Sequence, residues 1–396
     1  MQSSNPTVDA QIRCDQVAIL GADFPGLRIR ADVAEGDVVH AGQVLFHDRK
    51  RPDIAFVAPV DGEVAAIRYG AKRLFSSLVL TCGTKAEGSE PEVSPVAGER
   101  KAIVAALTGN GFWPSFIKRP FGGMPDPSAM PSAIFVTATA ASESAPDPRA
   151  VLEGRLDALG RALEALTLLS DGPVFLCQPK GADLLPVVPA KVTVAKFSAK
   201  PGFSLAGTHV HRLHPVGAGR SVWTIGYQDA VSIGHFLAAG QRDFTRMVAV
   251  RSSAHDPAKI VRLPLGAKLS DVMRSDAPQS LAGARLMSGS KEQAREAAYL
   301  GRYHEEVMRK PTKPTAASIH PEPIIAHAGL DQGLAMNLLA VPLMRALSVG
   351  DVESAERLGC LELLEDDVAA LSARCTSGTD YGRCLRRALD ALKEAA

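Results

Sequence analysis

Two short apolar runs with a helical stretch between them place the strongest constraint on how this chain folds. The runs Ile134–Ala138 and Val174–Cys177 have the β-branched and aromatic composition of buried strands. Between them, Asp147 supplies a helix N-cap and Pro148 a favoured first helical residue. Leucines at helical spacing follow at positions 152, 156, 159, 163 and 166, before Asp171-Gly172-Pro173 ends the helix. This order predicts a βαβ unit in a mostly parallel sheet, extended by a further strand over 192–195.

No nucleotide-binding motif opens this unit. The first predicted strand leads into Ala141-Ser142-Glu143-Ser144 rather than G-x-G-x-x-G, and the segment from Gly202 to Gly207 lacks the Lys-Ser/Thr pair of a P-loop. We therefore expect a Rossmann-like scaffold that binds no nucleotide.

The N-terminal segment 12–82 has a different pattern, with short β-type runs separated by glycines. Residues 36–45 read G-D-x-V-x-x-G-Q-x-L and residues 58–64 read A-P-x-x-G-x-V, which indicates hairpins. This pattern resembles the barrel-sandwich hybrid of biotinyl and lipoyl domains, which carry a modified lysine at a hairpin tip. Lys50 lies near that place but lacks the usual Met-Lys-Met or Asp-Lys-Ala context. We expect a structural β-domain with an unmodified, exposed Lys50.

The fold class predicted for the whole chain is a multidomain α/β and β protein. It has a barrel-sandwich-hybrid-like domain over 1–95 and a Rossmann-like α/β domain over 96–255. In 256–325, the run Leu265–Val272 resembles the small β-grasp domains of soluble-ligand-binding modules, and 326–396 is predicted helical. Polar segments at 84–100 and 310–322 are expected to be a linker and a loop.

Composition excludes several classes of function. With 44 Lys and Arg against 43 Asp and Glu, the net charge of +1 gives no support for binding nucleic acid or a charged membrane surface. The apolar stretch from Leu334 to Met344 is far shorter than the ~20 residues of a membrane span. The N-terminus has no secretory pattern, so we expect a cytoplasmic protein. The six cysteines include no C-x-x-C pair, which disfavours zinc and iron–sulfur sites. A disulfide framework is not expected in a chain of this length without an export signal.

Two clusters of polar residues are candidates for sites. His209, His211 and His214 are close in sequence, and on a strand the first two would share a face and could chelate a metal. Without an acidic or cysteine partner nearby, we favour plain hydrogen-bonding roles at a strand end or loop. The acidic cluster Glu362, Glu365, Asp366 and Asp367 is expected at a helix N-terminus.

The segment 111–121 concentrates one of the two tryptophans and three of the 13 phenylalanines beside Lys118 and Arg119. Such a segment can hold a flat ligand by stacking and cation–π contacts, or it can dock one domain on another. The sequence alone leaves both interpretations open.

These segments, in this order, resemble the A subunit of the sodium-translocating NADH:quinone reductases. The resemblance is colinear and covers most of the chain. The stretches that carry it are 17–21, 24–28, 70–73, Trp113-x-x-Phe116-x-x-Arg119-Pro120-Phe121, 133–138, 205–211, 227–229, 286–290, 299–304 and 358–363.

The resemblance implies a peripheral subunit on the cytoplasmic face of the bacterial inner membrane, docked on the membrane-embedded B subunit. It implies ubiquinone as the ligand, no redox cofactor on this chain, and NADH, FAD, FMN and iron–sulfur clusters on partner subunits. The isolated chain is then not expected to be catalytic. By resemblance, two segments contact quinone: the residues are Leu20, Gly21, Phe24, Gly26 and Leu27 in the first, and Phe116, Arg119 and Phe121 in the second. Phe24, Phe116 and Phe121 would form an apolar slot and Arg119 the donor to a quinone carbonyl.

This sequence departs from the family in three places. It lacks some tens of residues after 302–304, it has Cys375-Thr376-Ser377-Gly378 in place of the usual Cys-Pro-Gly-Lys, and its segment before Val17 is diverged. Two alternatives therefore stay open. One is a scaffold subunit of another electron-transfer complex, similar to the C subunit of the Rnf complex without its iron–sulfur clusters. The other is a stand-alone enzyme or a biotin or lipoyl carrier.

Overall fold

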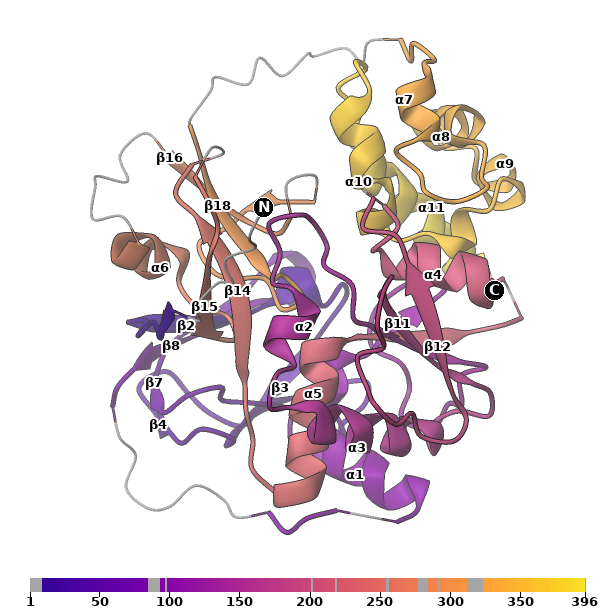
Figure 1. Ribbon diagram of the computed structural model, residues 1–396. Coiled ribbons are helices and arrows are strands. Elements are labelled where there is room, and N and C mark those ends of the chain that lie inside the picture. Colours follow the sequence, from indigo (N-terminus) through magenta and orange to yellow (C-terminus); the bar gives the residue numbers. More distant parts are fainter. Residues whose placement is uncertain are drawn as a thin grey trace.

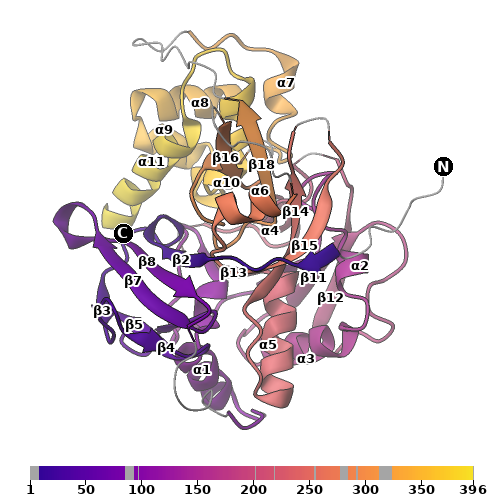
Figure 2. The same cartoon turned by 90° about the vertical axis from the view of Figure 1, so that its left-hand side faces the viewer.

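The computed structural model divides into an N-terminal β-domain, a central α/β domain, a six-stranded sheet and a C-terminal group of helices (Figures 1 and 2). It describes residues 9–84, 93–96, 98–200, 202–217, 219–253, 256–276, 284–290, 293–311 and 323–395. Residues 85–92 and 97 of the predicted linker, and residues 312–322 of the predicted loop, lie outside these residues.

The N-terminal β-domain is formed by two small antiparallel sheets. The first contains β2 (Gln16–Leu20), β8 (Phe75–Cys82), β7 (Gly62–Tyr69) and β4 (Val38–Val39), in that order. The second contains β3 (Ile29–Ala31), β5 (Val44–Asp48) and β6 (Ala55–Val57). Between them the rings of Phe46 and Phe56 stack 4.6 Å apart, and Phe46 is fully buried. The exposed Lys50 lies in the turn between β5 and β6, as expected for a hairpin tip.

The central domain is built on a five-stranded sheet in the order β12-β11-β10-β13-β9. Its strands are β9 (Ile117–Arg119), β10 (Ile134–Thr137), β11 (Val174–Pro179), β12 (Val192–Phe197) and β13 (Val222–Gly226). All pair in parallel except β9, which is antiparallel to β13. The prediction of a mostly parallel sheet with strands near 134, 174 and 192 is confirmed.

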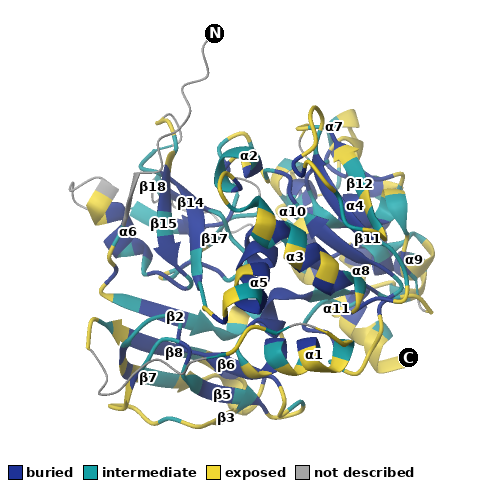
Figure 3. Ribbon diagram, turned by 60° about the horizontal axis from the view of Figure 1, so that its bottom comes forward, coloured by how far each residue is buried: buried dark blue, intermediate teal, exposed yellow. Residues whose placement is uncertain are grey.

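The helices of this domain are α1 (Arg100–Gly109), α2 (Pro148–Val151), α3 (Leu156–Thr167), α4 (Ala206–Leu213) and α5 (Tyr227–Ala239). Figure 3 shows α3 and α5 side by side, and α5 is buried over most of its length. They pack so closely that a Cβ at Gly234 of α5 would lie 1.8 Å from the carbonyl oxygen of Ala158.

The predicted leucine-rich helix is divided in two. Its N-terminus is as expected: the carboxylate of Asp147 accepts a hydrogen bond from the backbone N–H of Arg149, and Pro148 is the first helical residue. The helix then stops, and α3 starts only at Leu156. Gly154 lies between the two helices with φ of +73°, a conformation that ends a helix at little cost only for glycine.

The third sheet has the order β1-β15-β14-β18-β16-β17. Its strands are β1 (Asp9–Gln11), β14 (Thr245–Arg251), β15 (Lys259–Pro264), β16 (Ala284–Ser288), β17 (Arg295–Glu296) and β18 (Glu306–Pro311). β15 leads into α6 (Leu269–Asp276) through the run Leu265–Val272. The sheet also includes β14, which the predicted boundaries assign to 96–255, and β1, which joins it from the N-terminal side by pairing in parallel with β15.

The C-terminal helices have a hydrophobic core of their own, centred on residues such as Leu343, Leu371 and Leu385. The helices are α7 (Ala328–Asp331), α8 (Ala340–Val349), α9 (Val352–Arg357), α10 (Glu365–Arg374) and α11 (Tyr381–Ala395). Glu365, Asp366 and Asp367 form the first turn of α10, so the prediction that this acidic cluster lies at a helix N-terminus is confirmed for these three residues. Among the described residues no helix is both long and apolar enough to cross a bilayer.

Candidate functional site

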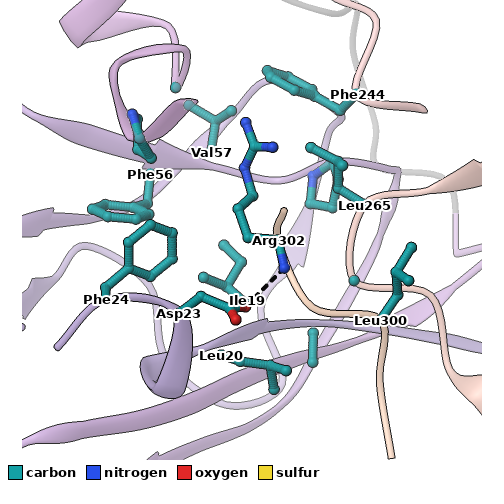
Figure 4. A pocket seen from close by; sticks show the side chains of 15 residues that line it. Ile19, Leu20, Asp23, Phe24, Phe56, Val57, Phe244, Leu265, Leu300 and Arg302 are labelled. Carbon is teal, nitrogen blue, oxygen red and sulfur yellow. Dashed lines mark hydrogen bonds between the residues drawn. The ribbon is translucent and has the colours of Figure 1, made fainter. Parts of the chain in front are cut away.

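An apolar pocket lies where the N-terminal β-domain meets the six-stranded sheet (Figure 4). Phe24 and Phe56 form one wall, with their rings edge to face at 5.0 Å, while Phe244, Leu265 and Leu300 lie on the opposite side. Leu20, at the end of β2, also lines it. The cavity has a volume of about 50 Å³.

A tight turn positions Leu20 and Phe24. The chain makes a 3₁₀ turn over Gly21–Asp23, directly against β8, and a Cβ at Gly21 would lie 2.0 Å from the carbonyl oxygen of Phe75. Only glycine fits there. Gly26, with φ of +76°, then turns the chain again and directs Leu27 into the core, where it is buried.

Arg302 is the polar group of this pocket. Its backbone N–H donates to Asp23 Oδ2 at 2.9 Å, and its side chain crosses the pocket between the two apolar walls (Figure 4). The guanidinium donates to Ser115 Oγ at 2.9 Å and lies 2.8 Å from Asp229 Oδ1. Arg295 also bonds Asp23, so the turn at Gly21–Asp23 is tied to the third sheet by two contacts.

Asp229 connects the pocket to the α/β domain. Its second oxygen accepts from Arg246 Nη2 at 2.6 Å, and both side chains are buried. Burial alone raises the pKa of Asp229, but the guanidinium groups of Arg246 and Arg302 outweigh that effect and hold the pKa below its ordinary value. Asp229 is therefore a fixed carboxylate that orients two arginines.

The structure divides the residues predicted to contact quinone. Leu20 and Phe24 line the pocket, and Gly21, Gly26 and Leu27 shape the turn that presents them. Phe116, Arg119 and Phe121 do not line it. Phe116 is fully buried between Trp113 and Trp223, with ring centroids 5.2 and 5.7 Å away.

Arg119 and Phe121 contact the C-terminal helices instead. Arg119 Nη1 donates to Asp367 Oδ2 at 2.7 Å and to the carbonyl of Glu362 at 3.1 Å. Phe121 packs against the C-terminal core, and its carbonyl accepts from Arg386 at 2.8 Å. Of the two interpretations of segment 111–121, these contacts favour the docking of one domain on another.

Sequence reasoning missed Phe56, Asp229, Arg246 and Arg302 as site residues. Asp229 and Arg302 do fall in stretches 227–229 and 299–304 that carry the family resemblance. That was the one signal in the sequence, but it did not indicate a role for either residue.

The segment that carries the histidine cluster forms a helix and not a strand, since His209 and His211 lie on α4. On a helix, residues two apart point in different directions. His209 Nε2 bonds the carbonyl of Phe203 at 3.0 Å, whereas His211 bonds Glu362 Oε2 at 2.8 Å and the backbone N–H of Asn337 at 3.1 Å. His214 bonds Ser132 at 3.1 Å. The three side chains therefore serve three separate contacts.

The two N-terminal domains and the full chain can each be compared with known proteins. Residues 2–83 match the NqrA N-terminal barrel-sandwich hybrid domain, and residues 98–242 match the NqrA second alpha/beta domain. The fold is thus that of a multidomain α/β protein whose first domain is a barrel-sandwich hybrid, as predicted.

Curated relatives extend the match to nearly the whole chain. The A subunit of the Na(+)-translocating NADH-quinone reductase from a Marinomonas species is 32% identical over 435 aligned positions, covering 98% of this chain and 96% of the relative. The Neisseria meningitidis serogroup A protein of the same name is 32% identical, covering 96% and 94%. The chain belongs to the family of A subunits of the Na(+)-translocating NADH-quinone reductases. The first alignment is longer than the 396 residues of this chain, so the relative has residues with no counterpart here.

Among solved structures, a chain of an NAD+-reducing NiFe-hydrogenase in the air-oxidized state aligns with this chain. The identity is 14%, the TM-score 0.38, and the alignment covers 75% of this chain and 61% of that one. This likeness is too distant to carry an argument.

Proposed function

We propose that this chain is a quinone-associated, non-catalytic subunit of a sodium-translocating NADH:quinone reductase. The observation that carries the proposal is the match over 98% of the chain to a relative that bears this name. On this proposal the chain lies on the cytoplasmic face of the membrane, attached through the B subunit, among other partners. NADH, flavins and iron–sulfur clusters belong to those partners, and this chain binds none of them.

We further propose the pocket of Leu20 and Phe24 as the place where ubiquinone contacts this chain. A quinone ring needs apolar walls and a hydrogen-bond donor for a carbonyl oxygen. Phe24, Phe56 and Leu20 supply the walls, and the guanidinium of Arg302 supplies the donor in place of Arg119. A cavity of ~150 Å³ holds a benzene ring, so the present volume of about 50 Å³ requires a side chain to move on binding.

A photoreactive ubiquinone analogue tests the pocket in membranes that contain the assembled complex. We expect labelled peptides from 16–27 or 300–303. A Leu20→Trp variant fills the pocket and is expected to reduce the labelling at least tenfold. Leu74→Trp is the matched control, because Leu74 is on the same domain, is 37% exposed and does not line the pocket.

Three outcomes are informative. Loss of labelling in Leu20→Trp alone supports the pocket. Labelling confined to 116–123 keeps the quinone association but moves the contact to the other predicted segment. Absence of any labelling on this chain, while partner subunits are labelled, contradicts the quinone association itself. Recovery of flavin-containing partners with a tagged chain separately tests whether it belongs to the complex.

A further inference from the structure

A second cavity, of about 180 Å³, lies at the carboxyl end of the parallel sheet. The chain leaves β10 for β11 on one side and later reaches β13 on the other side of β10, so the strand order reverses between β10 and β13. Ligands of open α/β sheets bind outside the strands at such a switch point. Thr137 and Thr139 from the end of β10 and Gly226 and Tyr227 from the end of β13 line the cavity.

Carboxyl groups outnumber guanidinium groups around the cavity. Two guanidinium groups line it, against five carboxyl groups, which gives a formal net charge of −3. Arg119 is paired with Asp367 and Arg246 with Asp229. The three remaining carboxyl groups, of Glu305, Glu306 and Asp366, have no ion-pair partner in the part of the chain that the structure describes.

Hydrogen-bond acceptors in the cavity wall lack donors. Glu306 is 3% exposed, and its Oε2 accepts from Ser142 Oγ at 2.9 Å, but its buried Oε1 has no partner among the residues that the structure describes. Within the described ranges, Asp367 Oδ1 and Thr137 Oγ1 are also buried without a partner. Each such group costs about 1–3 kcal/mol unless a donor reaches it. Burial raises the pKa of Glu306, because its effect outweighs that of Arg251. Burial also raises the pKa of Glu305 to about 7, because its effect outweighs that of Arg246.

The same geometry disfavours an anionic ligand. The N-terminus of α4 faces the cavity, and in nucleotide-binding folds such an end binds phosphate. Here the protein's own carboxylate occupies that place, since a Cβ at Gly207 would lie 2.3 Å from Asp367 Oδ1. A phosphate would meet this carboxylate and the others around it.

A metal ion also fits poorly. Among the described residues no group of three or more His, Cys, Asp and Glu side chains is placed to share one. His304 lines the cavity, but its Nδ1 bonds Ser288 Oγ at 2.8 Å, and burial lowers its pKa to about 3, so it adds no positive charge. The Nε groups of Arg119 and Arg246 are buried donors that meet no acceptor in the described part of the chain, and an oxygen of an organic ligand could supply one.

We propose that this cavity binds a small organic ammonium ion that also carries hydroxyl or carbonyl oxygens. The ammonium donates to Glu306 Oε1 and Asp367 Oδ1 and offsets the unpaired carboxylates. The oxygens of the ligand accept from the arginine Nε groups. This function is separate from the quinone contact, since Leu20 and Phe24 do not line the cavity.

Isothermal titration calorimetry of the full chain tests the proposal with glucosamine and ethanolamine as probes. Glucose is the control that lacks the ammonium group, sodium chloride the control for a metal cation, and inorganic phosphate the control for an anion. We expect saturable binding of at least one amine and none of the three controls. Glu306→Gln is expected to weaken amine binding at least tenfold. Glu296→Gln, at an exposed carboxylate on β17 outside the cavity, is expected to leave it unchanged.

A second variant separates loss of amine binding from a folding defect in Glu306→Gln. Thr137→Val keeps the shape of the side chain and removes one unpaired oxygen, so it is expected to weaken amine binding without loss of the thermal transition. Equal binding of glucose and glucosamine would overturn the proposal. So would binding of phosphate, or the lack of a saturable signal for both amines at millimolar concentration.

Discussion

Replacing Arg119 by methionine is expected to destabilise the protein rather than to affect ligand binding alone. The guanidinium lies 2.7 Å from Asp367, and the two side chains are 5% and 1% exposed. Methionine keeps most of the apolar stem but leaves the Asp367 carboxylate buried without its counter-charge. Removal of one partner of a buried ion pair costs about 3–5 kcal/mol.

The structure allows this cost to be separated from loss of packing. Asp367 Oδ2 also accepts the backbone N–H of Leu364 at 2.8 Å, so Asp367→Asn removes the charge and retains an oxygen that can accept this bond. The double variant Arg119→Met/Asp367→Asn is therefore expected to regain at least ~1.5 kcal/mol over the single variant. Arg357→Met is the matched control: its pair with Glu353 is exposed at both ends, and its loss is expected to cost less than ~0.5 kcal/mol.

Two measurements report on the two sides of the pair. Both tryptophans are fully buried beside β9, so urea unfolding followed by their fluorescence monitors the α/β domain. Hydrogen exchange of the amides of α10 monitors the C-terminal helices, and their protection is expected to fall in Arg119→Met. If Arg119→Met stays within ~1 kcal/mol of the unmodified chain, the assignment of a structural role is refuted. Loss of quinone affinity with unchanged stability would then return Arg119 to the ligand site.

Three further predictions follow from packing and charge. Gly234→Ala places a Cβ against the Ala158 carbonyl and is expected to destabilise by more than ~2 kcal/mol in thermal unfolding, because α3 and α5 must separate. Gly160→Ala on α3 meets no atom within 4 Å and is expected to stabilise by ~0.5–1 kcal/mol; a loss of stability would contradict the packing. The raised pKa of Glu305, about 7 against 4.5, means that the folded state holds its proton more tightly than the unfolded state. This difference in proton affinity contributes at most ~3 kcal/mol to the free energy of unfolding. The contribution is complete below pH 4.5 and is lost as the pH rises through 7. Denaturation at several pH values measures it, and Glu305→Gln is expected to make the free energy of unfolding less dependent on pH in this range.

The strands of the central domain could be predicted because their signals are local. β10 and β11 contain continuous apolar runs, and such runs are typical of parallel strands covered on both faces. β9 gave no such signal: it has three residues, Ile117–Arg119, and owes its conformation to pairing with β13.

For the histidine segment, the strand considered from the sequence was wrong. Its threonine and valine favour a strand by intrinsic preference, yet the segment forms α4. The helix is held by non-local contacts, among them the bond between His211 and Glu362, 151 residues away. The tertiary contacts overrode the local preference for a strand.

The site could be predicted only in part for the same reason. Leu20 and Phe24 came from the family resemblance, which also emphasised Arg119. The partner that engages Arg119 is 248 residues away, and Arg302 meets Asp23 across 279 residues. Such pairings leave no spacing pattern in the sequence, so only the three-dimensional structure shows which arginine belongs to the pocket.

The pairing of β1 with β15 has a consequence for the order in which the chain folds during synthesis. The N-terminal β-domain needs nothing beyond residue 82 to complete its two sheets, so it can form while the rest is still being translated. β1 precedes that domain, yet its partner is β15 at Lys259–Pro264, and the sheet is complete only after Pro311. β1 is therefore synthesised long before its partner strand β15. Until β15 is available, the unpaired edge of β1 can pair with wrong strands. A ribosome-stalled series that ends before and after residue 311 should show the β-domain protected from protease early and β1 protected only late.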